Sequence, residues 1–438
     1  MARRHVLIGG GPAAIAAAET IREADPGAEI VVVCADPHGY YSRPGLAYYL
    51  AKEVPEKGLF PFTPRDLAGL RVTVLIERVK SIDRAAHRVT LESGRELPCD
   101  RLLIATGSRA IPAKAPGAEL DGVVKLDQMA DARDLIRRCR KARTAVVVGG
   151  GITALEMVEG LRAHRVHVHY FLRKDRYWSN VLSESESRIV EQALLREHVE
   201  IHPYTDLAGI LGRNGRVVAV ETGDGTTIPC DLVGVAIGVR PRIELAEAAG
   251  LACGRGILVD QYLRSSDPDI YAAGDVAEVC DALSGHRTLE VLWNSAVVKG
   301  RVAGLNMATE PVHAYEEGTP HNATRLAGLH ATIIGTVGSG EDADLEGIAR
   351  GDSQIWSELC DAAIVEAQRG DAHIRIALGD DTIMGAVVIG DQALSFPLQE
   401  LIEAHVDVSG IVAELEAPEA PIVELVNDAW RSWKEQRA

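Results

Sequence analysis

Two short apolar runs stand out along the chain, and each is followed directly by glycines. The runs are His5–Ile8 and Ala145–Val148, and their continuous apolar character is typical of parallel strands buried on both faces. Each is followed by a helical pattern. Ala13–Arg22 is rich in alanine, and Thr153–Leu161 has apolar residues at helical spacing. The pattern therefore predicts two strand–turn–helix units far apart in one chain.

The turns of these two units share one glycine-rich arrangement. They read Gly9-Gly10-Gly11-Pro12-Ala13-Ala14 and Gly149-Gly150-Gly151-Ile152-Thr153-Ala154. Glycines let the backbone approach a pyrophosphate, the helix N-terminus offers unpaired N–H groups, and a small third residue lets the helix pack on the strand. A single such turn is often only a strand-to-helix connection. Two of them predict two dinucleotide sites.

Two more segments pair a short strand with a small-residue turn. Leu102–Arg109 is a strand pattern that ends in Ala105-Thr106-Gly107, and Asp269–Val276 is one that ends in Gly274-Asp275. Each alone could be a buried strand and its turn. With these four motifs in this order, the chain resembles the FAD-dependent pyridine nucleotide oxidoreductases, the two-dinucleotide-binding flavoproteins, from about residue 5 to residue 310.

The resemblance implies a role for each motif. The first turn would bind the FAD pyrophosphate, Ala105, Thr106 and Gly107 would close over the FAD, and Gly274 with Asp275 would contact the flavin ribitol. The second turn would bind NAD(P)H. The turn residues assigned to the cofactors are Gly9, Gly11, Pro12, Ala13 and Ala14 for FAD, and Gly149, Gly151, Ile152 and Ala154 for NAD(P)H.

Five further positions match the family pattern singly. Asp36 would bind the adenosine ribose, the Val79 backbone would contact the adenine, and Trp293 would begin a helix that points at the flavin pyrimidine. Gly238 would close the nicotinamide site, and Glu156 would orient the nicotinamide as the catalytic residue. The alternatives are a turn aspartate for Asp36, a carboxylate favoured by the helix dipole for Glu156, and core packing for the others.

The predicted fold class is α/β, with two Rossmann-like dinucleotide-binding domains and a C-terminal α+β domain. Residues 1–110 and 244–311 would form the FAD-binding domain, and residues 111–243 the NAD(P)H-binding domain. Residues 312–438 would form an interface or partner-docking domain. It would hold a glycine-punctuated stretch at Ala331–Gly340, then a hairpin of Ile374–Leu378 and Ile383–Ile389, then helices to the C-terminus.

A proline stands where the disulfide-reducing members of this superfamily carry a redox cysteine. The position is Pro44, in the segment Tyr40–Tyr49, and a proline cannot act as a thiolate. The seven cysteines are scattered without a Cys-x-x-Cys pair, and we expect most of them to be buried core residues: Cys34, Cys99, Cys139, Cys230, Cys253, Cys280 and Cys360. We therefore expect no redox-active disulfide.

The residues around Pro44 indicate a subgroup. Tyr-x-Arg-Pro-x-Leu resembles ferredoxin and rubredoxin reductases and the flavin part of NAD(P)H nitrite reductase, in which Arg43 and Pro44 would line the FAD. The alternative for Arg43 is a surface arginine in a turn. Ala47-Tyr48 stands where many ferredoxin reductases have Ser-Lys, and this departure favours the rubredoxin or nitrite side.

These observations predict an enzyme that passes hydride from NAD(P)H to FAD and then electrons to a protein partner. The partner would be ferredoxin, rubredoxin or a nitrite-reductase-like subunit, and a homodimer is possible. One alternative is an NAD(P)H oxidase or quinone reductase. Another is a flavoprotein with little turnover that signals or assembles in a redox-dependent way. The fold alone does not choose among them.

The second nucleotide unit carries basic residues where an acid would select NADH. Leu172 falls at the expected acidic position, and Arg173, Lys174 and Arg176 follow. Guanidinium groups suit a 2′-phosphate, so Arg173 and Arg176 predict that NADPH is used at least as well as NADH. The alternatives are a solvated basic turn, or a ribose contact from Asp175.

Charge and hydropathy exclude other classes. The formal net charge of −17 disfavours nucleic acid or an anionic membrane as the main partner. No apolar stretch reaches 18 residues, and the N-terminal apolar run is too short for a signal peptide, so we expect a cytoplasmic protein without a membrane span. His164, His167 and His169 have no carboxylate or cysteine at ligand spacing, so we expect no metal site.

Overall fold

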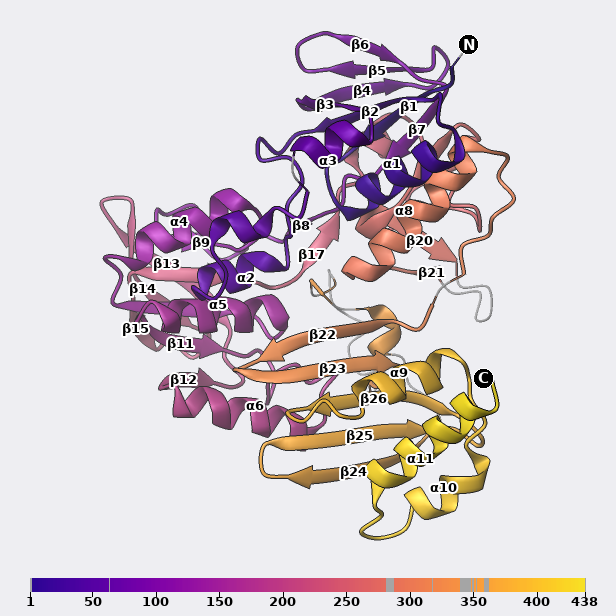
Figure 1. Cartoon of the computed structure of the whole chain (residues 1–438). Helices are drawn as coiled ribbons and strands as arrows, with labels where there is room; N and C mark the ends of the chain where they lie inside the picture. The colour runs from indigo at the N-terminus through magenta and orange to yellow at the C-terminus, as the bar shows by residue number, and fades with distance from the viewer. Residues whose placement is uncertain are drawn as a thin grey trace. The chain divides into compact units, whose positions relative to one another are not determined.

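The computed structural model describes residues 2–62, 64–280, 287–316, 318–338, 348, 350–351, 353–357 and 362–437 (Figure 1). The chain forms two compact units. The first unit contains Met1–Ile111, Asp127–Ala132 and Val239–Glu317. The second contains Pro112–Leu126, Arg133–Gly238 and Gly318–Ala438, and thus combines the predicted NAD(P)H-binding segment with the C-terminal residues.

The first unit is built on a five-stranded parallel sheet. Its central strand is β1 (Arg4–Ile8), with β2 (Glu29–Cys34) on one side and β7 (Arg101–Ile104) on the other; the edges are β3 (Val72–Ile76) and β19 (Ile270–Ala272). The strands are almost continuously apolar because helices cover a parallel sheet on its faces. The helices α1 (Pro12–Ala24) and α8 (Trp293–Ala308) pack on one another.

Smaller elements complete the first unit. β8 (Ser108–Ala110) pairs with β17 (Val239–Pro241), where the chain leaves this unit and returns to it. α4 (Met129–Cys139) begins in this unit and continues into the second. The remaining elements are an antiparallel meander of β4 (Val79–Asp83), β5 (Arg88–Leu91) and β6 (Glu96–Pro98), a small sheet of β18 (Ile257–Leu258), β20 (Ala277–Cys280) and β21 (Arg287–Thr288), the helices α2 (Gly45–Leu50), α3 (Pro64–Gly69) and α7 (Glu244–Ala248), and the 3-10 turns η1 (Glu56–Leu59) and η2 (Gly274–Val276).

The second unit repeats the same sheet design. The central strand β10 (Thr144–Val148) lies between β11 (His167–Phe171) and β16 (Leu232–Val235), and β12 (Val199–His202) and β9 (Val123–Val124) form the edges. An antiparallel meander precedes β16, as one precedes β7; its strands are β13 (Leu207–Arg213), β14 (Arg216–Thr222) and β15 (Thr227–Pro229). α5 (Ile152–Ala163) and α6 (Glu184–Arg196) connect the parallel strands. The prediction of two Rossmann-like domains is confirmed.

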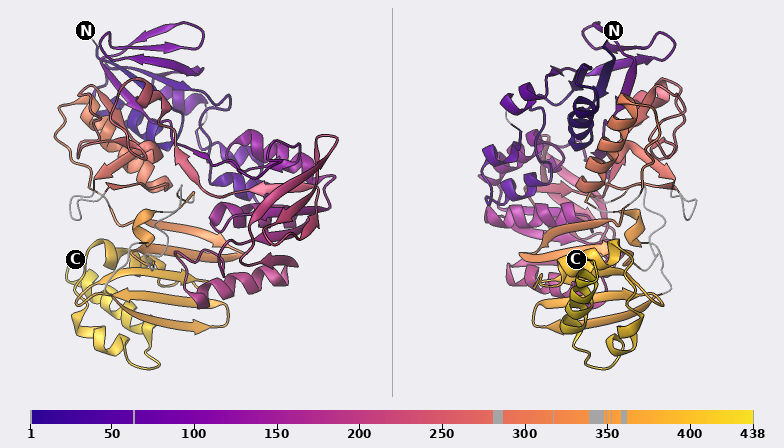
Figure 2. Two further views of the ribbon diagram at one scale, coloured as in Figure 1. Left: turned by 180° about the vertical axis from the view of Figure 1, so that it is seen from behind. Right: turned by 45° about the vertical axis from the view of Figure 1, so that its right-hand side comes forward.

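The C-terminal residues form an antiparallel sheet with helices on one face, as Figures 1 and 2 show. The helices are α9 (Ser395–Glu403), α10 (Ser409–Leu415) and α11 (Ile422–Glu435), which follow the last strand in the chain. The strand order is β22 (His321–Leu326), β23 (Leu329–Gly335), β26 (Ile383–Ile389), β25 (Ala372–Leu378) and β24 (Ala363–Arg369); η3 (Gln354–Ser357) lies between β23 and β24 in the chain.

The predicted hairpin is present as the antiparallel pair β25 and β26. The predicted glycine-punctuated stretch begins within β23, and its residues 339–340 lie outside the described residues. Ile376 and Leu378 of β25 face the core that contains the helices, whereas His373 and Arg375 alternate with them. Arg375 Nε donates to Glu186 of α6 at 3.0 Å, so a buried ion pair joins this sheet to the nucleotide-binding part of the same unit.

Candidate functional site

The first glycine turn lies at the carboxyl end of β1, and its backbone leaves no room for side chains. Gly9 has a φ of +127°, and a Cβ there would lie 2.1 Å from the carbonyl oxygen of Ala105. A Cβ at Gly10 would lie 2.4 Å from Cys34 Sγ. The turn is therefore held against β2 and β7 by contacts that only glycine permits.

The start of α1 has the features that a bound pyrophosphate requires. Gly11 is the N-cap residue and has no side chain to cap the helix, and a Cβ at Gly11 would meet no atom within 4 Å. Pro12 fills the first helical position, where its missing N–H costs nothing. The N–H groups of the first turn thus have no side-chain cap from the N-cap residue and lie at the positive end of the helix dipole, which fits a dinucleotide phosphate.

The other two FAD motifs converge on this turn. The Ala105 carbonyl lies beside Gly9, and Gly274, with a φ of +78°, lies so close to α1 that a Cβ there would be 3.2 Å from Ala13 Cβ. Asp275 Oδ2 accepts a hydrogen bond from Ser108 Oγ at 2.6 Å. The structure therefore brings the Gly turn, the Ala-Thr-Gly segment and the Gly-Asp segment together at one edge of the parallel sheet.

Arg43 and Pro44 lie at the start of α2, where Pro44 is the N-cap residue. Arg43 Nη1 donates to the Asp127 carbonyl at 3.2 Å and lies 3.9 Å from its carboxylate. The Asp127 side chain is fully buried, and Arg242 Nη2 lies 3.7 Å from its other oxygen. A buried carboxylate between two guanidinium groups thus positions Arg43, which argues against a free surface arginine.

The segment after Thr106 is fixed by the same cluster. Thr106 Oγ1 donates to the Arg242 carbonyl at 2.9 Å, and the Arg242 N–H donates to the Gly107 carbonyl at 2.9 Å. Arg242 Nε donates to the Ser108 carbonyl at 3.0 Å. Gly107 has a φ of +66°, a conformation that suits glycine.

Asp36 lies just beyond β2, but protein groups already use its carboxylate. Oδ2 accepts from the Tyr41 hydroxyl at 2.9 Å, and Oδ1 accepts from the His38 N–H at 3.0 Å. These bonds form a local turn of the kind that aspartate favours. They support the turn alternative more than the predicted ribose contact.

Val79 and Trp293 are the first residues of a strand and a helix of the first unit, and their contacts with FAD stay predictions. Val79 begins β4, two residues after Glu77, whose N–H donates to the Cys34 carbonyl at 2.9 Å, so the chain here lies beside the end of β2. Trp293 is the first residue of α8, and its ring lies 6.0 Å from that of Tyr40. Tyr40 in turn makes an edge-on contact with Phe62.

The second glycine turn has the same geometry as the first. Gly149 has a φ of +143°, and a Cβ there would lie 2.1 Å from the Ala236 carbonyl oxygen and 3.1 Å from Ala154 Cβ. Gly151 is the N-cap residue of α5 and offers no side-chain cap. Ile152 is buried, and Gly238, with a φ of +108°, follows Ala236 closely. This turn also fits a dinucleotide pyrophosphate.

Glu156 lies near the start of α5, with Glu159 and Arg350 as its charged neighbours. Burial, followed by the nearby Glu159 carboxylate, raises the pKa of Glu156 to about 8, against the opposing charge of Arg350. Glu156 is therefore neutral at pH 7 and can donate a hydrogen bond from its carboxyl group. This state suits a group that binds an amide, and a helix-dipole contact alone would not require it.

The two predicted arginines beyond β11 differ in their surroundings. Arg176 Nη1 donates to Asp175 at 2.8 Å, and Arg176 Nη2 donates to the Ser179 carbonyl at 3.3 Å. Arg173 is exposed, and the described part of the chain provides it with no hydrogen bond or ion pair. Of the two, Arg173 is the side chain left available for a ligand phosphate.

The described cysteines are all free thiols, and four of the six are buried. Burial raises the pKa of Cys99 to about 11 and that of Cys230 to about 12, and it also raises the pKa of Cys34. Such thiols are poor sources of thiolate at neutral pH. Cys360 lies outside the described residues.

The structure places a carboxylate beside two of the histidines for which we expect no metal site. His167 and His169 of β11 do have a carboxylate beside them, because the parallel neighbour β12 places Glu200 opposite His169. The His167 Nε2 to Glu200 Oε1 distance is 2.9 Å, and the His169 Nδ1 to Glu200 Oε2 distance is 3.2 Å. The spacing of residues along the sequence does not reveal a side chain that comes from an adjacent strand.

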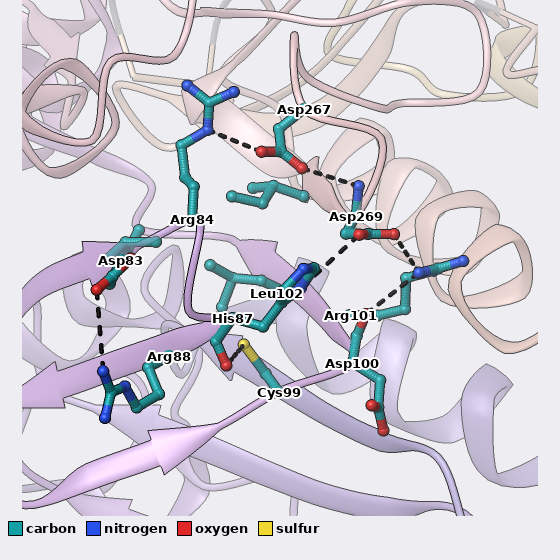
Figure 3. Close-up of a pocket in the computed structure, with 12 residues that line it drawn as sticks. Asp83, Arg84, His87, Arg88, Cys99, Asp100, Arg101, Leu102, Asp267 and Asp269 are labelled. Atoms are coloured by element: carbon teal, nitrogen blue, oxygen red, sulfur yellow. Dashed lines mark hydrogen bonds and ion pairs between the residues drawn. The ribbon is translucent and has the colours of Figure 1, made fainter.

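In a small pocket elsewhere in the first unit, charged side chains of the lining form ion pairs with one another. Figure 3 shows charged side chains of the β4–β5 hairpin facing the loop before β19. Arg84 Nε donates to Asp267 at 2.7 Å, Arg101 pairs with Asp269, and His87 Nδ1 lies 3.7 Å from Asp269. This network joins the meander to the parallel sheet and leaves little charge for a ligand.

Sequence reasoning missed the residues that hold the motifs in place. Asp127 and Arg242 belong to no motif and reach the site from distant segments, and Ser108, next to Gly107, was given no role of its own. Gly300 and Gly304 did leave a signal, since small residues four apart on a helix permit close helix packing. A Cβ at Gly300 would lie 2.2 Å from the Ala13 carbonyl oxygen, and one at Gly304 would lie 2.6 Å from that of Ala17.

The family model described as pyridine nucleotide-disulphide oxidoreductase matches residues 3–300. The chain belongs to this family. It is 34% identical over 351 residues to the ferredoxin–NAD(+) reductase component of a biphenyl dioxygenase system from Paraburkholderia xenovorans, with 80% of this chain and 84% of that protein covered. It is 30% identical over 321 residues to an NADH oxidase of Methanocaldococcus jannaschii, with 70% of each covered.

Solved structures show the same fold. The ferredoxin reductase of the CYP199A2 system from Rhodopseudomonas palustris superposes with a TM-score of 0.85 at 23% identity, covering 97% of this chain and 99% of that one. The protein is an FAD-dependent NAD(P)H oxidoreductase, and the resemblance inferred from its motifs is confirmed. Among the described residues, no helix is long and apolar enough to cross a membrane.

Proposed function

We propose that this enzyme takes hydride from NAD(P)H and delivers electrons to a small iron–sulfur or rubredoxin-type protein. The observation that carries the proposal is the Tyr-x-Arg-Pro segment at α2, where Pro44 caps the helix next to an Arg43 held by Asp127. Because Pro44 is not a thiol, this segment cannot pass electrons on through a disulfide at that position. The similarity to a ferredoxin–NAD(+) reductase component supports the same reading.

Bound FAD would supply the hydride acceptance and the one-electron release, and the protein would supply position and charge. The α1 N-terminus and Gly11 would hold the pyrophosphate, and Asp275, fixed by Ser108, would hold the ribitol. In the second unit, the α5 N-terminus would hold the nicotinamide nucleotide, with the neutral carboxyl group of Glu156 donating to the carboxamide. No proton transfer is required of Glu156 in this scheme.

The oxidase alternative has its own support, since an NADH oxidase is among the relatives. Oxygen needs no docking surface, whereas a protein acceptor does. The two alternatives therefore differ in how turnover responds to an added protein acceptor. The third alternative, a signalling flavoprotein, would show little turnover with any acceptor.

An acceptor comparison at fixed NADH and NADPH tests the proposal. The FAD-loaded protein is mixed with a [2Fe–2S] ferredoxin, a rubredoxin, a soluble quinone or air-saturated buffer. We expect kcat/KM for one of the iron–sulfur or rubredoxin proteins to exceed that for the quinone, and oxygen consumption to be at least tenfold slower. Oxygen consumption that equals or exceeds the turnover with both proteins would favour the oxidase.

The preference for NADPH and the cytoplasmic location stay predictions. Arg173 supports the first, since it is exposed beyond the end of β11, where a nucleotide 2′-phosphate would lie. The second is compatible with the six free cysteines that the structure describes, because cytoplasmic thiols stay reduced. The predicted dimer and the docking role of residues 312–438 likewise stay predictions.

A further inference from the structure

Four side chains on two neighbouring strands of the second unit gather their ligand atoms at one edge of the sheet. His167 and His169 are two residues apart on β11 and so point to the same face. On the edge strand β12, Glu200 is the register partner of His169, and His202 lies two residues further on. The pairing of β11 with β12 therefore brings three imidazoles and one carboxylate to the same face of the sheet, and none of the four residues belongs to the glycine turn.

Within this histidine cluster (His167, His169, Glu200 and His202), the ligand atoms of His167, His169 and Glu200 all lie within 4.8 Å of one another, and His202 adjoins them. The two Glu200 oxygens lie 2.9 Å from His167 Nε2 and 3.2 Å from His169 Nδ1. His169 Nδ1 also lies 3.1 Å from His202 Nε2. Tetrahedral zinc with bonds of ~2.0–2.1 Å holds its ligand atoms roughly 3.3 Å apart.

The cluster is also reachable and held in place. The His167 and Glu200 side chains are 40% and 53% exposed, whereas His169 is only 14% exposed. The His202 ring packs edge-on against the buried Phe171 ring, with centroids 5.3 Å apart. A solvated ion can therefore enter from outside and meet imidazoles whose rings are fixed by the strand and its neighbours.

We propose that His167, His169 and Glu200, with His202 beside them, bind a divalent first-row transition ion of the zinc type. Imidazole and carboxylate ligands suit Zn²⁺, while Mg²⁺ and Ca²⁺ prefer oxygen ligands alone. The ion would join the edge strand β12 to β11, which ends at Phe171, just before Leu172 and Arg173. Its effect would be to stabilise this sheet, since an ion that binds only the folded chain raises stability by mass action.

Equilibrium dialysis of the FAD-loaded full chain tests the site. The protein is dialysed against buffered Zn²⁺ with excess Mg²⁺, and bound zinc is measured by elemental analysis. We expect one zinc per chain at micromolar free Zn²⁺. The double variant His167→Ala/His169→Ala should lose at least tenfold in affinity, and Glu200→Gln should weaken binding by a smaller factor.

His330→Ala is the matched control, because His330 is an exposed histidine of the same unit that lies outside the cluster. It should bind zinc as the wild type does. FAD content and the melting temperature without zinc show that each variant is folded. Zinc should raise the melting temperature of the wild type and of His330→Ala, but not that of the double variant. Zinc that persists unchanged in the double variant, for example on cysteines, would overturn the proposal, and so would a wild type that binds none.

Discussion

At the scale of single residues, the surroundings of Glu156 shift its pKa far enough to change its protonation state at pH 7. Its pKa of about 8 means that the folded protein keeps a proton that a free glutamate would release near its usual pKa. The carboxyl group is therefore a donor at pH 7 and becomes an anion only as the pH passes about 8. A neutral donor suits the nicotinamide carboxamide, whereas an anion beside Glu159 does not.

We predict that the rate of reduction by NAD(P)H falls in wild type as the pH rises through about 8. Glu156→Gln keeps an uncharged group, so its rate at pH 7 should stay within a few-fold of wild type and should not fall at higher pH. Stopped-flow absorbance at 450 nm from pH 6 to pH 9.5 measures this. Glu197→Gln, at an exposed glutamate of the same unit, is the control, and an identical fall in Glu156→Gln would show that another group titrates.

Arg173 separates the two nucleotides. Because it is exposed and its counterpart Arg176 is bonded to Asp175 and Ser179, its loss should affect the 2′-phosphate alone. We predict that Arg173→Ala raises the Kd for NADPH roughly tenfold, the loss of about 1.4 kcal/mol of charge-assisted binding, and leaves that for NADH nearly unchanged. Arg213→Ala, an exposed arginine on β13, should change neither Kd. If Arg173→Ala had the same Kd for NADPH as the wild type, the turn would not contact the 2′-phosphate.

At the scale of elements, α1 and α8 pack closely because α8 has glycines, Gly300 and Gly304, where it contacts α1. A Cβ at Gly304 would lie 2.6 Å from the Ala17 carbonyl oxygen, so the two helices would have to separate. We predict that Gly304→Ala lowers the free energy of unfolding by about 1–3 kcal/mol and weakens FAD binding, because α1 also carries the Gly11 turn. Gly410→Ala in α10 meets nothing within 4 Å and should be neutral or stabilising. A melting temperature of Gly304→Ala equal to that of Gly410→Ala would rule out this account of the contact.

A buried histidine of β25, His373, lies beside Glu186 of α6 and contributes to the contact between these two elements. Desolvation alone would lower the pKa of His373, but the carboxylates of Glu186 and Glu366, which lie 3.5 Å and 3.7 Å from its ring nitrogens, outweigh it and raise the pKa to about 9. The folded pKa lies above the unfolded value of about 6.5, so the stabilisation is complete below pH 6.5 and is lost as the pH rises through 9. We predict that the melting temperature of wild type falls over this window and that His373→Gln falls less. The exposed His330→Gln should follow wild type, and parallel curves for all three proteins would contradict the assignment.

Elements that follow from local pattern could be predicted, whereas contacts between distant segments could not. Both strand–turn–helix units and the β25–β26 hairpin follow from apolar runs and turn residues alone. Asp127 between Arg43 and Arg242 could not be foreseen, since the three residues lie in unrelated segments. The same holds for Glu200 beside His169, because strand register in a parallel sheet is set by the whole fold. Asp36 was placed correctly at the end of β2, but its bonds to Tyr41 and His38 depend on a loop path that local pattern does not define.

At the scale of the whole molecule, we expect FAD alone to store electrons. Pro44 stands at the redox position, and four of the six described thiols are buried, with raised pKa values for Cys99 and Cys230 among them. Replacing the seven cysteines by serine or alanine should therefore keep reduction by NAD(P)H within a few-fold of wild type. Stopped-flow reduction of the folded variant, with its FAD content measured beside it, checks this. A loss of more than tenfold at full FAD content would show that a thiol takes part.

The most direct measurement is an anaerobic reductive titration of the purified, FAD-loaded protein, followed at 450 nm, first with dithionite and then with NAD(P)H. We predict a yellow protein with one noncovalent FAD per chain, and we expect it to take up two electrons and no more. We further predict that Asp275→Ala binds FAD more weakly. A colourless chain that does not bind added FAD, or an uptake of four electrons per chain, would contradict the account.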